Sequence, residues 1–415
     1  MLEHFFHWPP QVARLRNTPG VELLDAFAEH LKQCGYSRSQ GGRHLRAAAH
    51  LLRWLDRGKF PLTEIDPVAV SGFVRHLERC RCAGFADMPR DRALRGVRAF
   101  TAYLQDRPLC TACHGQSDEV PSVLWESFCR WMREQRGTSD RTLRDYGDYL
   151  HRLLRDIGDE TDKLTPAYLR RFILELGRNG GNARAKSTTS ALRMFIRFLI
   201  VEGRCPAGLD EAIPSVAYWR LSSLPRYLQP EEVEQVLDSP DQRTPVGKRD
   251  QAILLLLARL GLRAGDVVHL RLSDIDWRAA TVSVCGKNRR QALLPLTQEV
   301  GDAIADYLLH GRPPTASDCI FVRAIAPYRP FRDTRGISDV AKLALRQAGV
   351  KAPARGAAHL LRHSAATSML RQGATLQDIA SVLRHQSVAS TQIYAKVDVV
   401  ALQELAQPWP EVLPC

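Results

Sequence analysis

The sequence has no apolar run that approaches the length of a membrane span. Its first residues, MLEHFFHWPPQVARLR, lack the order of basic, apolar and small residues that marks a secretory signal. Both absences argue against a membrane protein and against export. We therefore expect a protein of the cytoplasm or, in a bacterium, of the nucleoid.

Acidic residues are fewer than basic ones: 45 Asp and Glu stand against 58 Lys and Arg, a formal net charge of +13. The excess is mostly arginine, whose planar guanidinium suits phosphate oxygens. A balance of this size is expected of nucleic-acid-binding proteins, although basic proteins without that role are common. Composition thus favours DNA or RNA as a partner without deciding the matter. The length of 415 residues allows two or three domains.

Because a secretory signal is lacking, the ten cysteines are expected as reduced thiols rather than as a disulfide framework. Four of them form the pairs Cys80-x-Cys82 and Cys110-x-x-Cys113, with His114 next. These five residues are candidates for a structural zinc site, although the gap of 27 residues is not a standard finger spacing. The alternative is a set of small, half-buried thiols. A c-type haem attachment, which CxxCH also matches, is disfavoured by the missing export signal.

Two stretches with helical periodicity, residues 21–109 and 120–205, resemble each other. In each, a capping residue precedes a proline at the first helical position, as Asp66-Pro67 and as Thr165-Pro166. The apolar positions keep helical spacing in both stretches, so each can bury its own core. We interpret them as a duplicated four-helix domain that follows an N-terminal arm, residues 1–20.

The pattern changes after the second helical stretch. Residues 206–226 contain three prolines and no helical period, which predicts a linker. From residue 227 to 415 the pattern is mixed, with a buried helix inside Arg249–Leu262. The runs Thr281–Cys285 and Gln291–Leu296 predict a β-hairpin. The expected fold is therefore mainly α, with a small hairpin or sheet in the C-terminal domain.

The stretch Gly356–Lys396 carries the residues with the clearest chemistry. His359 and Arg362 are one helical turn apart and share a face. His385 follows a second helix, and Tyr394 follows nine residues later. Taken singly, each has an ordinary structural interpretation. Together, two imidazoles, a guanidinium and a phenol suit phosphoryl transfer.

Local signals place these residues on three consecutive short helices. Arg371-Gln-Gly373 predicts the end of the first helix, and Thr375 predicts the cap of the second. Ser387 is the predicted cap of a short third helix that carries Tyr394.

These motifs resemble a known family. H-L-L-R-H-S-A-A-T, L-R-H-Q-S and T-Q-I-Y are similar to the C-terminal signature of tyrosine recombinases, the phage-integrase family. G-L-R-A-G-D-V-V-H-L-R-L-S-D-I-D-W resembles its first-arginine box, and G-K-N-R-R-Q-A-L-L-P-L resembles its hairpin. Asn288-Arg289 stands where the family often has a second glycine, which affects turn geometry more than chemistry. The resemblance covers about residues 120–405 and is most specific in 260–396.

The resemblance implies a catalytic set of Arg263, Lys287, His359, Arg362, His385 and Tyr394. Tyr394 would attack a DNA phosphodiester and form a 3′-phosphotyrosyl link, while the two arginines and His385 contact the phosphate. Lys287 would protonate the leaving 5′-oxygen, and His359 would assist proton transfer at the tyrosine. Because the link keeps the bond energy, neither a cofactor nor a catalytic metal is expected.

Two further residues have open interpretations. Asp266 either orients the Arg263 guanidinium or is a surface acid beside an arginine. His363 is expected to pack or cap rather than to react.

The resemblance also implies partners and domain roles. The implied partners are double-stranded DNA with specific recombination sites, further copies of the chain (a tetramer on DNA) and accessory recombinases. Residues 120–205 correspond to the core-binding domain and 227–415 to the catalytic domain. Residues 21–109 lie outside the resemblance, and two roles stay open for them: binding DNA beyond the core site, or binding a partner subunit. The tail 398–405 is predicted to dock onto a neighbouring subunit. The glycine-rich basic loop 179–187 is a better candidate for a phosphate contact than any single basic residue among Arg141, Arg144, Arg170, Arg171, Arg178, Arg184, Lys186 and Arg193.

The favoured function is a site-specific recombinase, an integrase or transposase of a mobile element. One alternative is a DNA-binding regulator with the same fold and no catalysis, which the complete residue set disfavours. A telomere resolvase or type IB topoisomerase shares the chemistry, but the short tail and the tandem helical N-terminus favour a recombinase. A zinc-dependent interaction protein built on residues 80–114 is the third alternative.

Overall fold

The computed structural model describes residues 1–60, 67–85, 87–105, 123–158, 160–178, 181–216, 224–285, 291–354, 356–385, 390–397 and 402–403. Contacts divide the chain into two units, one formed by Met1–Cys113 with Ser223–Cys415 and the other by His114–Ser222. No helix in the described ranges is long and apolar enough to cross a membrane.

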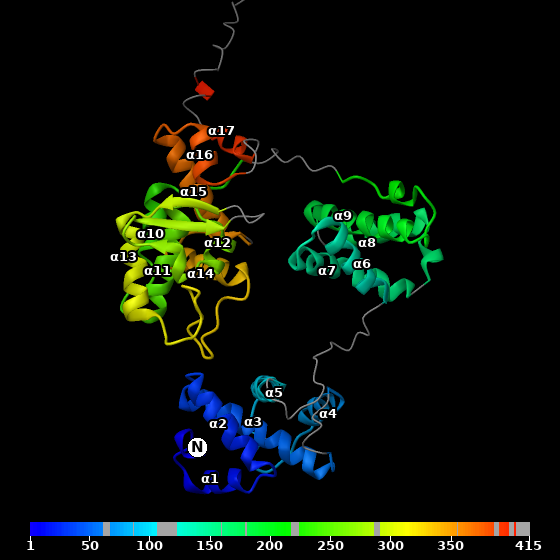
Figure 1. The fold of residues 1–415 in the computed structure, drawn as a ribbon, viewed down its shortest axis with the longest axis vertical. Coiled ribbons are helices and arrows are strands. Elements are labelled where there is room, and N and C mark those ends of the chain that lie inside the picture. Colours follow the sequence, from blue (N-terminus) through cyan, green and yellow to red (C-terminus); the bar gives the residue numbers. More distant parts are fainter. Residues whose placement is uncertain are drawn as a thin grey trace, which may run out of the picture. The chain divides into compact units, whose positions relative to one another are not determined.

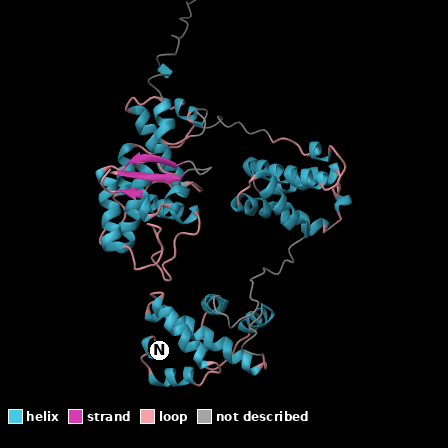
Figure 2. Cartoon of the chain, viewed as in Figure 1, coloured by secondary structure: helices cyan, strands magenta, loops and turns pink. Residues whose placement is uncertain are grey.

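The chain is described below as three segments, each with its own hydrophobic core. They are the first helical segment (residues 1–105), the second helical segment (123–216) and the C-terminal segment (224–403) (Figure 1). Helices dominate all three, and the described strands lie in the C-terminal segment (Figure 2). This composition confirms the predicted mainly α fold.

Helix α3 is central to the first helical segment, where it contacts α2, α4 and α5. The elements are η1 (Leu2–His4), α1 (Pro9–Arg16), α2 (Val21–Gln33), α3 (Arg38–Arg57), α4 (Pro67–Leu77) and α5 (Arg90–Gln105). The first twenty residues, predicted as an arm, contribute buried Leu2, Phe5 and Leu15 to this core. The ring of Phe5 lies so close to Gly41 of α3 that a Cβ there would be 2.1 Å from it. These residues are therefore part of the helical body and not a free arm.

The second helical segment has the same order of four main helices. Its elements are α6 (Val123–Arg136), α7 (Asp140–Ile157), η2 (Thr161–Lys163), α8 (Pro166–Arg178), α9 (Gly181–Val201) and η3 (Leu209–Ala212). Helices α4 and α8 begin at Pro67 and Pro166, which confirms the predicted proline starts.

Two local predictions for the second helical segment are wrong. Residues 181–187 belong to α9 and not to a loop, because Ala, Arg and Lys there are good helix formers. Asn179 and Gly180 lie outside the described residues. Residues 206–213 were assigned to the linker, but Leu209 and Ile213 are buried in the core of this segment, and η3 contacts α8 and α9.

The C-terminal segment combines helices with a small antiparallel sheet of order β1-β2-β3. Its elements are α10 (Pro230–Leu237), α11 (Pro245–Ala258), α12 (Ala264–His269), η4 (Leu272–Asp274), β1 (Ile275–Asp276), β2 (Thr281–Cys285), β3 (Gln291–Pro295), α13 (Gln298–Asp306), η5 (Tyr307–Gly311, a π-helical turn), α14 (Thr334–Gln347), α15 (Ala357–Arg371), α16 (Leu376–Val382) and α17 (Gln392–Ala395). Strand β2 pairs with β3 from Thr281 opposite Pro295 to Cys285 opposite Gln291. The predicted hairpin is therefore confirmed, while its tip, with Lys287, lies outside the described residues.

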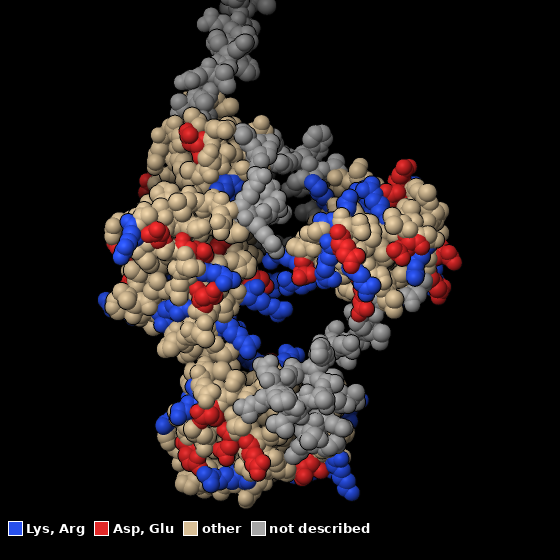
Figure 3. All heavy atoms as spheres, in the orientation of Figure 1, with Lys and Arg blue, Asp and Glu red and all other residues tan. Residues whose placement is uncertain are grey.

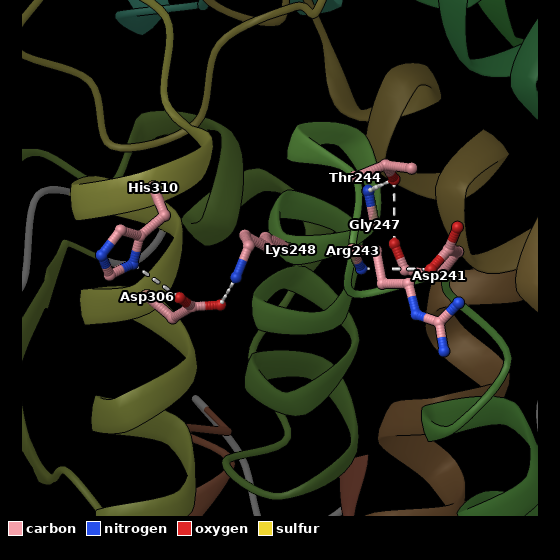
Figure 4. Close-up of polar contacts among 7 residues, drawn as sticks. All are labelled: Asp241, Arg243, Thr244, Gly247, Lys248, Asp306 and His310. Atoms are coloured by element: carbon pink, nitrogen blue, oxygen red, sulfur yellow. Dashed lines mark hydrogen bonds and ion pairs between the residues drawn. The ribbon is translucent and has the colours of Figure 1, made fainter.

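Helix α11 begins with a tight cap. Thr244 Oγ1 accepts a hydrogen bond from Gly247 N at 3.0 Å and donates one to Asp241 O at 2.9 Å (Figure 4). A Cβ at position 247 would lie 1.9 Å from Asp241 O, so this turn requires glycine.

The flank of α11 is tied to α13 and η5 by polar contacts. Lys248 forms an ion pair with Asp306, which also lies 2.8 Å from His310 Nδ1 (Figure 4). Nearly all side chains from Ala252 to Ala258 are buried in the core, and α11 contacts α13, α14 and α15. The turn that follows α11 therefore has a rigid support, as predicted for Arg263.

Candidate active site

Helix α15 presents three candidate residues one after another. It begins after Gly356, whose φ of 80° is left-handed, and it ends at Arg371, two residues before Gly373 with φ of 89°. The predicted helix end is thus confirmed. His359 is exposed, Arg362 is 2% exposed and His363 is half-buried. The rings of His359 and His363 stack with centroids 5.2 Å apart.

Arg362 joins two turns that are far apart in the sequence. Its Nη1 donates to Gly261 O, and its Nη2 donates to Leu383 O at 2.5 Å. Gly261 has a φ of 58°, and a Cβ there would lie 2.6 Å from the Leu383 side chain. Burial, with the charge of Arg263 adding to it, lowers the pKa of Arg362 to about 10. The guanidinium therefore stays charged at neutral pH.

Arg263 stands at the start of α12, on the turn that Arg362 holds. Its Nη2 donates to Arg384 O at 2.9 Å, and burial lowers its pKa. Asp266 is buried: its Oδ2 accepts from Arg263 N at 3.1 Å and from Arg384 Nη2 at 2.5 Å. Asp266 thus caps α12 and pairs with a different arginine. Neither predicted role, orienting the Arg263 guanidinium or lying on the surface, is correct.

Arg384 is a residue of this site that sequence reasoning missed. Its φ is 54°, a backbone conformation that residues other than glycine rarely adopt. Its side chain is 10% exposed, and its Nε and Nη1 have no partner among the described residues. No sequence signal indicated this role, because its partner Asp266 is 118 positions away.

His385 and Tyr394 complete the cluster. His385 Nδ1 lies 2.7 Å from Thr391 Oγ1, and burial, followed by the charges of Arg362 and Arg263, lowers its pKa to about 4. Tyr394 is 1% exposed, and its ring stacks with that of His385 at 6.5 Å between centroids. Burial raises the pKa of Tyr394 to about 12.

His363, expected only to pack or cap, lies against the tyrosine. Its Nδ1 is 2.7 Å from Tyr394 Oη. Burial lowers the pKa of His363 to about 4, so the ring is neutral near pH 7, and its tautomer decides which of the two groups donates the hydrogen bond. The contact joins α15 to α17 across 31 positions of the sequence. Helical periodicity relates only residues within a few turns, so it could not predict this contact.

The caps of the last two helices differ in outcome. Thr375 Oγ1 accepts from Asp378 N at 3.1 Å, which confirms the predicted start of α16. The helix with Tyr394 begins at Gln392 with Thr391 at its N-cap, so Ser387 is not its cap. Ser387 itself lies outside the described residues.

The structure therefore brings five of the six predicted residues to one end of the C-terminal segment. Backbone and side-chain contacts link Arg263, Arg362, His385 and Tyr394, and His359 stacks beside them. Lys287 is the sixth, outside the described residues. Two positive groups beside a buried phenol form a site for an anionic ester.

Two family models match the chain: the phage integrase family over residues 226–400, and the phage integrase N-terminal SAM-like domain over residues 125–203. A Sinorhizobium fredii protein that carries the name integrase/recombinase y4rA is 37% identical over 416 residues, which cover 99% of this chain and 99% of that protein. The chain belongs to the phage integrase family. It is thus a tyrosine recombinase, an enzyme class that breaks and rejoins DNA strands.

Other relatives share only part of this recombinase. The tyrosine recombinase XerD of Listeria innocua is 27% identical over 293 residues, 68% of this chain and 96% of XerD. Two crystal structures have the same fold. One is of the XerH recombinase bound to its difH substrate, and the other is of a lambda integrase (75–356) dimer bound to a core site. Their TM-scores are 0.54 and 0.51, at 16% and 18% identity. They cover 82% and 70% of this chain, and 95% and 98% of their own lengths.

The Asp266–Arg384 pair of this recombinase predicts strong coupling in unfolding experiments. Arg384→Ala or Asp266→Asn alone leaves a buried charge without its partner and is expected to lower the free energy of unfolding by about 3–5 kcal/mol. The double variant is expected to lose less than the sum of the two single losses. Urea unfolding of the four proteins measures the coupling, and additive losses would contradict it.

A matched variant separates the ion pair from the backbone strain. Arg384→Gly loses the same ion pair but tolerates the φ of 54°. It is expected to be more stable than Arg384→Ala by about 1 kcal/mol.

Proposed function

We propose that this recombinase cleaves DNA with Tyr394, forming a 3′-phosphotyrosyl link and releasing a 5′-hydroxyl. The 5′-hydroxyl of a second strand then attacks this link, which joins the two strands and frees the tyrosine. The observation that carries the proposal is the cluster of Tyr394 with Arg362, Arg263 and His385 at one end of the C-terminal segment. The phenolic oxygen forms a new bond to phosphorus. The bond between phosphorus and the 5′-oxygen breaks, and the 5′-oxygen leaves. The number of phosphodiester bonds is unchanged, so rejoining needs no energy source.

The two arginines are proposed to bind the non-bridging oxygens of the reacting phosphate. Arg362 uses two of its five N–H donors on backbone carbonyls, which fixes the guanidinium plane and leaves three for the substrate. Arg263 is held by Arg384 O through one Nη2 donor. Fixed donors aimed at developing negative charge stabilise a transition state without reorganisation. His385 is proposed to add a further hydrogen bond.

Proton transfer is proposed at both ends of the reacting bond. At the tyrosine, His363 Nδ1 lies 2.7 Å from the phenolic oxygen, and the tautomer with an unprotonated Nδ1 can accept the phenolic proton. We therefore propose His363 as a proton acceptor beside His359. A phenol with a pKa of about 12 is a weak nucleophile until its proton is removed. At the leaving oxygen, Lys287, from the sequence between β2 and β3, is the proposed general acid.

The reaction requires a rearrangement around α17. Tyr394 is 1% exposed, so its oxygen is not accessible to a duplex in the DNA-free form. We propose that DNA binding displaces α17 from His363 and brings the phenol to the phosphate. The neighbouring Thr391, which holds His385 Nδ1, is carried on the same turn.

The second helical segment is proposed to bind DNA as a core-binding domain. Its family match supports this role, as do exposed basic side chains at Arg141, Arg144, Arg170, Arg171, Arg184 and Lys186. On the face of this segment seen in Figure 3, Lys and Arg are interspersed with Asp and Glu. Arg193 is less available, because it donates to Ile213 O at 3.0 Å. The side chain of Arg178 lies outside the described residues.

The biological role is proposed to be that of an integrase or transposase of a mobile element, acting as a tetramer on two duplexes, with accessory recombinases as further partners. The match to y4rA covers 99% of this chain, so it includes the first helical segment. The match to XerD covers 68% of this chain and nearly all of XerD, so XerD is shorter than this recombinase. We therefore group this chain with y4rA rather than with XerD. The tail 398–405, of which residues 402 and 403 are described, is the proposed contact with a neighbouring copy. Lambda integrase forms a dimer on its core site in a crystal with the same fold.

Strand exchange tests this proposal. Fragments of genomic DNA that bind the Tyr394→Phe protein identify the site, and two labelled duplexes with that site are then incubated with the wild-type protein. The expected result is joined product from both duplexes without added nucleotide. Binding without product would favour the inactive regulator. Relaxation of supercoiled DNA that lacks the site, with no exchange between duplexes, would favour a topoisomerase.

A further inference from the structure

Four metal-ligating side chains converge in the first helical segment, far in sequence from the proposed catalytic residues. His50 comes from α3 and His76 from the last turn of α4, while Cys80 and Cys82 follow α4 directly. One ligand atom of each residue lies within 4.8 Å of the ligand atoms of the other three. His50 is 3% exposed, and the other three are half-buried.

The distances between these atoms match a tetrahedral metal site. The Nε2 atoms of His50 and His76 are 3.3 Å apart, Cys80 Sγ lies 3.5 Å from His50 Nε2, and Cys82 Sγ lies 3.5 Å from His76 Nε2. Zinc binds nitrogen at about 2.0–2.1 Å and thiolate sulfur at about 2.3 Å. Tetrahedral angles then separate two nitrogens by about 3.3–3.4 Å, and a nitrogen from a sulfur by about 3.5–3.6 Å.

Hydrogen bonds alone do not account for all three contacts. A ring nitrogen of a neutral imidazole either donates or accepts. If each Nε2 accepts from its cysteine thiol, the two nitrogens face each other at 3.3 Å with their lone pairs. If one Nε2 donates to the other, it no longer accepts from its cysteine. A cation at the centre satisfies all four lone pairs at once.

The surroundings suit a closed structural site. The His50 ring stacks on Phe85 with centroids 4.6 Å apart and meets the edge of Phe73 at 5.0 Å. Cys82 N donates to Cys80 Sγ at 3.4 Å, and Arg57 Nη1 donates to Cys82 Sγ at 3.8 Å. Such donors stabilise thiolates and orient metal ligands.

We propose that His50, His76, Cys80 and Cys82 bind one zinc ion with a Cys₂His₂ ligand set. Four protein ligands leave no open position, so the role is structural and not catalytic. The ion joins the middle of α3 to the end of α4 and to the turn at residues 80–85. Trp54 of α3 also packs on Phe73 and His76 of α4, so the ion would add to an aromatic contact between the two helices.

This ligand set differs from the one that sequence spacing indicated. Cys80 and Cys82 belong to both sets, whereas Cys110, Cys113 and His114 lie outside the described residues. His50 and His76 were missed because each is one polar residue within an otherwise helical pattern. The spacing His76-x-x-x-Cys80-x-Cys82 was the available signal.

The first test is the metal content of the full-length protein. Protein produced with zinc in the medium and dialysed against metal-free buffer is expected to contain about one zinc per chain by elemental mass spectrometry. Cys80→Ser/Cys82→Ser is expected to lose it. Cys205→Ser/Cys319→Ser, which removes two half-buried thiols elsewhere, is expected to keep it. Loss of zinc in Cys110→Ser/Cys113→Ser with retention in Cys80→Ser/Cys82→Ser would overturn the assignment.

A second measurement needs no variant and is independent of folding defects. X-ray absorption at the zinc edge of the wild-type protein is expected to show two sulfur and two nitrogen neighbours. Alkylation of cysteines, mapped by mass spectrometry, is expected to spare Cys80 and Cys82 until a chelator is added, while the exposed Cys285 reacts throughout. Absence of bound zinc, a shell without sulfur or equal alkylation before and after chelation would each refute the site.

Discussion

Tyr394→Phe is expected to abolish the covalent protein–DNA adduct on a nicked duplex that carries the binding site. Phenylalanine lacks the oxygen that forms the bond to phosphorus, so the variant has no nucleophile at this position. The variant should still fold. It loses one hydrogen bond, between Tyr394 Oη and His363 Nδ1, worth about 0.5–1.5 kcal/mol. Denaturing gel electrophoresis of end-labelled DNA detects the adduct directly, and labelling each end in turn identifies the 3′ linkage.

The control is a second buried tyrosine of the same segment. Tyr307 is 1% exposed, and its Oη accepts a hydrogen bond from Val322 N at 3.5 Å. Tyr307→Phe therefore removes a buried hydroxyl that contacts Val322 and none of the proposed catalytic residues, and it should keep the adduct. If Tyr394→Phe forms the adduct at the wild-type rate, the nucleophile is a different residue.

The features that the sequence predicted well are local ones. Proline at the first helical position set the starts of α4 and α8, and Thr375 set the start of α16. The short apolar runs Thr281–Cys285 and Gln291–Leu296 identified β2 and β3. In these cases a few neighbouring side chains decide the backbone conformation, so the information lies within one turn or one strand.

The features that the sequence did not predict depend on tertiary contacts. The hydrogen bond between Tyr394 and His363 depends on how α17 packs on α15, and nothing in the helical pattern of α15 distinguishes His363 from a core residue. Arg384 adopts a left-handed conformation because its pairing with distant Asp266 compensates for the strain. Leu2 and Leu209, predicted in an arm and a linker, are instead buried because neighbouring helices have apolar surfaces against which they pack.

Arg362 shows how structure and chemistry share one side chain. It belongs to the catalytic set that the family resemblance implies, yet its two carbonyl partners also hold together the turns of Arg263 and His385. A phosphate-binding role alone would not require burial at 2% exposure. Burial instead keeps the guanidinium in one orientation, at the expense of a lowered pKa.

Arg362→Ala is therefore expected to reduce both catalysis and stability. Loss of a fixed donor to the phosphate should lower the rate of adduct formation by about 10²–10³-fold or more. Gly261 O and Leu383 O lose their partner in the core, which should lower the free energy of unfolding by about 2–3 kcal/mol. Arg362→Lys keeps the charge but lacks the planar fork that spans two carbonyls, so it should recover only part of either loss. Single-turnover cleavage and urea unfolding measure the two effects separately.

Arg371→Ala is the matched control on the same helix. Arg371 is exposed and donates to Gln229 Oε1 at 3.0 Å and to Tyr227 Oη at 3.1 Å, so it also makes two hydrogen bonds. Its partners remain accessible to water, and its loss should change stability by less than about 1 kcal/mol. If Arg362→Ala unfolds like Arg371→Ala but cleaves poorly, the residue acts on the phosphate alone. If both stability and cleavage match those of the control, Arg362 has neither role, and the cluster around Tyr394 is organised by other contacts.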